Sequence, residues 1–164
     1  MNGLFSFPNP VNEVSARLVA AGVVLMGVAA IVFQQPWLLV VLAYGFVARV
    51  LTGPKLSPLG LLATKVLTPR LPFPAKYVPG PPKRFAQACG AALTVPAAVL
   101  HFGLGVSTWA YGLIAVLVLF AFLESAFGLC VGCQIFALLM RVHVIPERAC
   151  PECADIWLRQ PSGA

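Results

Sequence analysis

The sequence predicts an all-α, polytopic membrane protein with four transmembrane helices and a cytoplasmic amphipathic helix in its central loop. The first observation is composition, because 60% of the 164 residues are hydrophobic and only 10% are charged. A soluble domain has about a quarter of its residues charged. The second is a mean hydropathy of +0.91. The third is the separation of four apolar segments by one long basic loop, which suits a single integral membrane domain over residues 1–164.

The first two apolar segments predict a helical hairpin. We expect helices over about 14–34 and 36–51, joined at the short polar sequence Gln34-Gln35-Pro36. A helix needs about 20 residues to cross a hydrocarbon layer of about 30 Å, so the apolar runs of both segments, Leu18 to Phe33 and Trp37 to Leu51, are short. Arg17 and Arg49 flank the apolar residues and reach toward the membrane surface with long side chains, which compensates for that length.

The central loop predicts a helix on the membrane surface. Ser57 is suited to cap a helix whose first residue is Pro58, and the helix extends to about residue 68. Its apolar residues recur with the spacing of one helical face: Leu59, Leu62, Ala63, Val66 and Leu67. We expect this face to contact lipid. Two proline-rich stretches follow and predict extended backbone up to Lys83.

The last two apolar segments predict a second hairpin. We expect helices over about 84–105 and 108–141, followed by a tail over residues 142–164. The fourth helix is predicted as one continuous segment, since apolar residues run through it with little interruption.

Basic residues predict the orientation. Seven of the eleven Lys and Arg residues lie between positions 49 and 84, where no Asp or Glu occurs. Short loops rich in Lys and Arg stay in the cytoplasm, so both termini also face the cytoplasm and the protein is a multi-pass protein of the cell membrane. The basic loop fits anionic headgroups of the lipid bilayer. Without a recognisable nucleic-acid-binding module, we expect no nucleic acid as a partner.

Paired cysteines are the main chemical signal. Cys130 and Cys133 form a CxxC pair near the end of the predicted fourth helix, and Cys150 and Cys153 form a second pair in the tail. All four lie on the cytoplasmic side in this topology, where thiols are kept reduced, so transient redox chemistry or metal binding is expected. The spacing C-x2-C-x16-C-x2-C also fits a four-thiolate zinc site made by these four residues. A third interpretation is that the cysteines are small, inert apolar residues.

Glu124 is the one acidic residue inside a predicted span, about 9 Å along the helix from Cys130. Acids inside a membrane are usually paired and face the bundle interior. We expect Gln87, Arg84 or Arg49 as its partner. Three roles stay open: a bond that holds helices together, a proton donor or acceptor for the thiols, and an ion ligand. No Ser-His-Asp arrangement, phosphate-binding glycine loop or HExxH occurs, so hydrolytic and phosphoryl-transfer enzymes have no support.

Two stretches carry a family resemblance. PPKRFAQACG (81–90) and GLCVGCQIFALLMR (128–141) resemble the two signatures of the small actinobacterial integral membrane proteins called domain of unknown function 4395. The resemblance implies four membrane helices and no established activity, with thioredoxin-like and sulfurtransferase proteins as partners. The second cysteine pair is not part of the signature, which gives more weight to Cys130 and Cys133 acting alone or with a partner.

The leading hypothesis is a membrane thiol-redox or sulfur-relay component. Cys133 exchanges with a soluble thioredoxin-like or sulfurtransferase partner, Cys130 resolves the product, and Glu124 acts beside them. The alternatives are a zinc-binding membrane protein and a structural or assembly subunit with inert cysteines.

Overall fold

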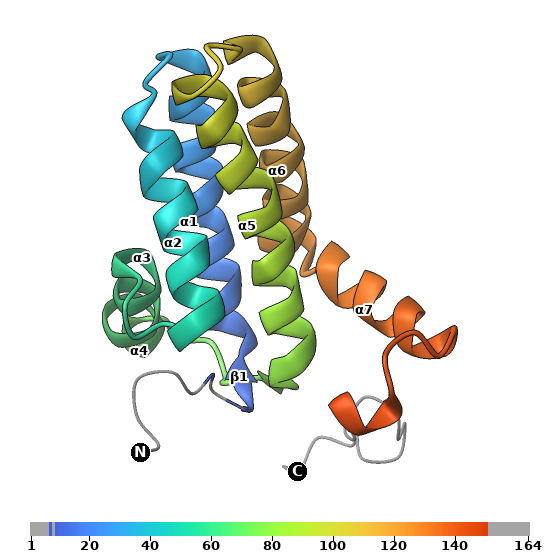
Figure 1. The fold of residues 1–164 in the computed structure, drawn as a ribbon. Helices are drawn as coiled ribbons and strands as arrows, with labels where there is room; N and C mark the ends of the chain where they lie inside the picture. The colour runs from blue at the N-terminus through green and yellow to red at the C-terminus, as the bar shows by residue number, and fades with distance from the viewer. Residues whose placement is uncertain (1–6, 8, 151–164) are drawn as a thin grey trace.

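The computed structural model describes residue 7 and residues 9–150, and its centre is a bundle of four antiparallel helices (Figure 1). The helices are α1 (Glu13–Val32), α2 (Trp37–Thr52), α5 (Gly80–Phe102) and α6 (Ser107–Phe127). α1 packs along α6, α2 packs along α5, and α5 also packs along α6. The described residues therefore form the predicted helical architecture with two hairpins.

The helices have the surface of a membrane protein. α1, α5 and α6 are long and apolar enough to cross a membrane, whereas α2 is an apolar helix of 16 residues. Large apolar side chains point outward from all four helices, among them Leu25, Val40, Val99 and Leu119. Such a surface cannot be exposed to water without a large free-energy penalty, so a lipid bilayer is its natural surroundings.

The core between the helices is made of aliphatic residues and of glycines that lie against side chains of the neighbouring helix. Leu39, Leu42 and Ile114 are almost completely buried, and Val23 packs with them. Gly90 of α5 lies against the ring of Phe46 in α2, where a Cβ would overlap the ring. Small residues at such contacts let helices pack closely in a bilayer, where the hydrophobic effect does not press them together.

The central segment forms one short helical rod beside α1. It begins with α3 (Pro58–Leu61), continues as the π-helical η1 (Leu62–Leu67) and ends as α4 (Thr68–Arg70). The predicted cap is present, because Ser57 Oγ accepts a hydrogen bond from the Gly60 N–H at 3.2 Å. The predicted apolar stripe is divided: Leu59 and Ala63 pack into the bundle core, whereas Leu62, Val66 and Leu67 are exposed.

A two-residue antiparallel strand pair, β1 (Val11–Asn12) with β2 (Tyr77–Val78), closes the lower end of the bundle. Beside it, the Glu13 N–H donates to the Lys76 carbonyl at 2.7 Å. Asn12 also caps α1 by accepting from the Val14 N–H at 3.0 Å. The pairing joins the start of the described chain to the segment before α5. The sequence does not predict this contact, because two-residue strands are too short to show an alternating pattern.

The start of α5 differs from the prediction. We expected extended backbone up to Lys83, but α5 begins at Gly80 and contains Pro81 and Pro82 in its first turn. Proline fits there because the first turn of a helix has no intrahelical partner for its N–H groups. Lys83 consequently lies in the helix and is buried.

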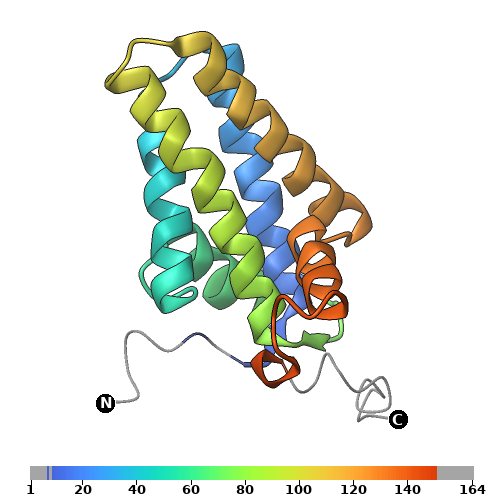
Figure 2. The same ribbon diagram turned by 45° about the vertical axis from the view of Figure 1, so that its right-hand side comes forward.

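The predicted fourth helix over 108–141 is divided into two. α6 ends at Phe127, Gly128 adopts a left-handed φ of 70°, and α7 (Val131–Arg141) starts again after Cys130. Glycine adopts this conformation without the steric penalty of a Cβ, and it commonly ends helices. α7 turns away from the bundle axis and crosses beside α5 (Figures 1 and 2). A 3-10 turn over Glu147–Ala149 follows, and Cys153 lies outside the described residues.

Candidate functional site

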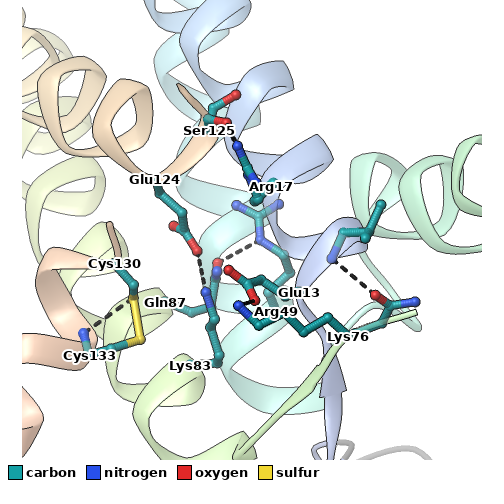
Figure 3. A network of polar contacts seen from close by, with 12 residues as sticks. Glu13, Arg17, Arg49, Lys76, Lys83, Gln87, Glu124, Ser125, Cys130 and Cys133 are labelled. Carbon is teal, nitrogen blue, oxygen red and sulfur yellow. Dashed lines mark hydrogen bonds and ion pairs between the residues drawn. A yellow bond between two sulfur atoms is a disulfide. The ribbon is translucent and has the colours of Figure 1, made fainter. Parts of the chain in front are cut away.

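The two cysteines of CVGC lie where α7 begins (Figure 3). Cys130 and Cys133 are joined by a disulfide, with their Cα atoms 5.2 Å apart. Cys130 is the N-cap of α7, and its Sγ accepts a hydrogen bond from the Cys133 N–H at 3.2 Å. Cys130 is 8% exposed, whereas Cys133 is half-buried. The pair therefore has one sulfur inside the protein and one nearer to its surface.

Two contacts hold α7 on α5. The backbone of Gly132 lies so close to Ala86 that a Cβ on Gly132 would be 2.5 Å from the Ala86 Cα. One turn further on, the ring of Phe136 packs on Phe85 with centroids 5.6 Å apart. The two sequence signatures thus meet in space, and their contact fixes the position of the cysteine pair.

Glu124, on the last turns of α6, forms an ion pair with Lys83 of α5. Lys83 Nζ lies 2.7 Å from Glu124 Oε1, and the two side chains are only 9% and 15% exposed. The predicted partners are engaged elsewhere: Arg84 donates to the Val50 carbonyl at 2.9 Å, and Gln87 accepts from Arg49. Lys83 takes their place because α5 begins earlier than predicted and turns this residue inward.

Arg49 links three segments at the same end of the bundle. Its Nε donates to Gln87 Oε1 at 2.8 Å, and its Nη1 donates to Ser57 Oγ at 3.0 Å. The guanidinium also lies 4.4 Å from the centre of the Phe46 ring. Arg49 is only 5% exposed, so it does not face lipid headgroups as the other basic residues of the loop were expected to do.

Arg17 joins α1 to the end of α6. Its Nε and Nη2 donate to the Ser125 carbonyl at 3.2 and 3.0 Å, and Nη2 also donates to the Ala126 carbonyl at 3.1 Å. Helix C-termini carry unpaired carbonyls and a partial negative charge, which a guanidinium stabilises. Arg17 therefore holds α6 at the point where the chain turns toward the cysteines.

A cavity of about 60 Å³ lies beside the cysteine pair, between α1, α2, α5, α6 and the start of α7. Its polar lining comes from Glu124 and Gln87, and Cys130 and Cys89 contribute two sulfurs. Space of this size beside polar groups admits water. The cavity thus brings a carboxylate and the buried sulfur of the disulfide to the same internal space.

The family model described as Domain of unknown function (DUF4395) matches residues 11–141, about four fifths of the sequence. The chain belongs to the DUF4395 family. Neither the comparison with curated proteins nor that with solved structures gives a match. In this DUF4395 protein, Cys130, Cys133, Glu124 and Lys83 lie inside the matched range, whereas Cys150 and Cys153 lie beyond it.

The structure describes three of the four cysteines of the predicted zinc site. Cys150 is 1% exposed and packs against Phe136 and Met140 of α7. Among the described residues, no group of three or more His, Cys, Asp or Glu is arranged to hold a metal ion. Because Cys153 lies outside the described residues, the zinc site made by all four cysteines stays a prediction.

Lys83 and Gly132 are the site residues that the sequence interpretation missed. Lys83 precedes Gln87 by four residues, so helical spacing places both on one face once the start of α5 is known. Gly132 sits between the two cysteines, and a glycine inside a helix is a signal of close backbone contact.

Proposed function

We propose that this DUF4395 protein is a membrane-embedded thiol–disulfide exchange component that works with a soluble thioredoxin-like partner. The observation that supports it is the asymmetry of the pair at the start of α7, with buried Cys130 capping the helix and Cys133 nearer to the surface. Disulfides in a reducing compartment are usually transient and catalytic, which matches a pair that opens and closes.

In this proposal α1, α2, α5 and α6 all cross the membrane, and the end that carries α7 faces the cytoplasm. α2 is about 24 Å long, which is short for a hydrocarbon layer of about 30 Å, but it packs along α5 and shares its depth. Trp37 and Trp109 are exposed at the opposite end, as expected for aromatic side chains at a membrane surface. Among the described residues, the exposed lysines and arginines lie at the α7 end of the bundle.

We further propose that α7 and the rod formed by α3, η1 and α4 lie at the cytoplasmic membrane surface. On α7, Leu138 is 58% exposed while Phe136 and Met140 are buried against α5 and the segment that follows α7. On the rod, Leu62, Val66 and Leu67 are exposed. Apolar side chains at this depth dip into the boundary between headgroups and acyl chains.

The exchange begins at Cys133. A thiolate of the partner attacks Cys133 Sγ, a mixed disulfide forms, and the Cys130–Cys133 bond breaks with Cys130 leaving as a thiolate. The Cys133 N–H and the N-terminal end of α7 stabilise that thiolate. The partner's second thiolate then attacks the partner sulfur that is bonded to Cys133. The partner's disulfide forms, Cys133 leaves as a thiolate, and two electrons have passed from the partner dithiol to the pair. In the reverse direction Cys130 resolves the mixed disulfide.

Glu124 donates and accepts the proton that accompanies this exchange. Cys130 must gain a proton when the pair is reduced and lose it when the pair closes again. Glu124 and Cys130 line the same cavity, which gives a carboxylate reached through water. The ion pair with Lys83 fixes the position of that carboxylate inside the bundle.

A sulfurtransferase partner fits the same site. With the pair reduced, the Cys133 thiolate attacks the outer sulfur of a persulfide on the partner, the partner's thiolate leaves, and Cys133 carries the persulfide. The Cys130 thiolate then attacks Cys133 Sγ, which closes the disulfide and releases hydrosulfide, and a partner dithiol reduces the pair again. With either partner, Cys133 therefore forms the bond to the incoming sulfur and Cys130 closes or opens the disulfide.

The test is to trap the mixed disulfide. In Cys130→Ser, Cys133 should form a covalent complex with a thioredoxin-like protein whose second cysteine is replaced and whose remaining cysteine is activated as a mixed disulfide with thionitrobenzoate. The complex should be stable on a non-reducing gel, because neither protein then supplies the resolving thiol. Mass spectrometry should locate the link at Cys133. Cys133→Ser should form no complex.

Cys89→Ser is the matched control, since it removes a thiol from the same cavity but leaves the pair intact. It should exchange like the original protein. If Cys130→Ser and Cys133→Ser both fail to react while both remain folded, the pair is a packing element and the DUF4395 protein acts as a structural or assembly subunit.

The alternative is a zinc-binding membrane protein, which the spacing of the two cysteine pairs favours. Zinc would be held by thiolates of Cys130, Cys133, Cys150 and Cys153, and sulfurs in a disulfide cannot take that role. The two functions therefore exclude one another in a single molecule. Purified protein that carries about one equivalent of zinc, lost in Cys150→Ser, would favour the metal and overturn the exchange mechanism.

A further inference from the structure

A groove separate from the cysteine site runs along the lower part of α1. It has a volume of about 470 Å³ and is open on one side. Its walls are one face of α1, the proline-rich segment before β2, and the end of α6 at Ser125. The exchange mechanism uses none of these residues.

One end of the groove is polar and carries more positive than negative charge. Arg17, Lys76 and Glu13 contribute their side chains there (Figure 3). Lys76 Nζ lies 2.8 Å from Glu13 Oε2, so that pair is neutral and Arg17 supplies the excess charge. The bonds from Arg17 to the α6 carbonyls use Nε and Nη2, so within the described part of the chain the Nη1 amino group is left for a ligand.

The rest of the groove is apolar. Leu18 and Ala21 continue the α1 face, and Leu71, Phe73 and Pro74 form the opposite wall. Phe73 is 64% exposed. A ligand with an apolar body along this wall would cover its ring.

We propose that the groove binds one anionic phospholipid of the surrounding bilayer, with its phosphate at Arg17 and one acyl chain along Leu18, Ala21 and Phe73. Charge complementarity supports a phosphate at the polar end, because a guanidinium makes strong, directed hydrogen bonds to phosphate oxygens. The order of the groups supports a lipid. Arg17 lies in the second turn of α1, and the apolar wall continues from there toward the bundle centre, which is the order of headgroup and chain in a bilayer.

The test measures lipid binding to delipidated, full-length protein in detergent through the shift of its thermal unfolding temperature. Dioleoylphosphatidylglycerol should raise that temperature, whereas inorganic phosphate and dioleoylglycerol should not, since each lacks half of the ligand. Arg17→Gln should weaken phosphatidylglycerol binding about tenfold or more, the loss expected for one hydrogen bond to a charged group. Lys65→Gln is the matched control, an exposed lysine outside the groove whose removal changes the net charge equally.

Two further variants keep the test decisive if Arg17→Gln does not fold, because Arg17 also caps α6. Ala21→Phe should fill the groove and abolish the lipid effect, while Val99→Phe, on the exposed face of α5, should leave it unchanged. Equal protection by inorganic phosphate, equal protection by dioleoylglycerol, or equal affinity in Ala21→Phe and Val99→Phe would each overturn the proposal.

Discussion

The two ends of the helical bundle are stabilised by different kinds of polar contact. At the end with the turns between α1 and α2 and between α5 and α6, side-chain hydrogen bonds are local, such as Ser107 with His101 at 3.1 Å. At the end that carries α7, local bonds are joined by others between residues far apart in sequence, such as Lys83 with Glu124 and Arg17 with Ser125. The first kind finishes a turn, whereas the second kind specifies which helices are neighbours. The cysteine pair therefore lies at the end where long-range side-chain contacts join the helices.

The largest expected difference between the ends is their side of the membrane. In a background without native cysteines, Thr108→Cys should react with a membrane-impermeant maleimide on intact cells, and Lys65→Cys should react only after permeabilisation. Both residues are exposed, so access to the reagent and not burial decides the result. The reverse pattern would place the cysteine pair outside the cytoplasm and contradict the topology.

Lys83→Met should destabilise the protein by about 3–5 kcal/mol, because it leaves the Glu124 carboxylate buried without its cation. Thermal unfolding in detergent measures the loss. The double variant Lys83→Met with Glu124→Leu should recover most of it, since an apolar pair of similar volume replaces the ion pair. A double variant that is no better than the single one would mean that Lys83 acts through contacts other than Glu124.

Gly132→Ala should destabilise the packing of α7 on α5 by about 1–3 kcal/mol, because the added methyl overlaps the Ala86 backbone, which cannot rotate away. It should also slow the exchange at Cys133, measured by the rate of mixed-disulfide formation. Gly112→Ala on α6 is the control, since a Cβ added there would have no atom of a neighbouring segment within 4 Å. Gly112→Ala should be neutral or stabilising by up to about 1 kcal/mol.

The smallest effect is expected at the opposite end of the bundle. Ser107→Ala removes the hydroxyl that pairs with His101 near the turn between α5 and α6, and it should destabilise the protein by no more than about 1 kcal/mol. The same thermal unfolding assay measures it. A loss as large as that of Lys83→Met would contradict the difference between the two ends.

The sequence predicted the four bundle helices and the cap at Ser57 because both depend on local patterns. Apolar runs determine where helices form, and a serine before a proline determines where one starts. It did not predict the division of the segment over 108–141, since apolar residues continue through Gly128 and only its backbone angle ends the helix. The backbone angle of Gly128 depends on the packing of α7 on α5, and these two helices are far apart in the sequence.

Side-chain partners were harder to predict than helices. Glu124 was correctly expected inside the bundle. Its partner was not, because Arg49, Arg84 and Lys83 all lie at the same end and the sequence does not show which of these cations reaches the carboxylate. The structure pairs it with Lys83 because the prolines at 81 and 82 start a helix and do not extend a loop. The cysteine pair was predicted from spacing alone, whereas its placement as a helix cap required the structure.

The main packing partners of the bundle come from different hairpins, since α1 packs chiefly on α6 and α2 chiefly on α5. This order has a consequence for biogenesis. When α1 and α2 have entered the membrane and the rest of the chain is still being synthesised, Gln87 does not yet exist to receive Arg49, and Arg17 has no carbonyls of α6 to cap. The polar contacts of the first hairpin are therefore complete only after α5 and α6 have been made, although Arg49 can already donate to Ser57.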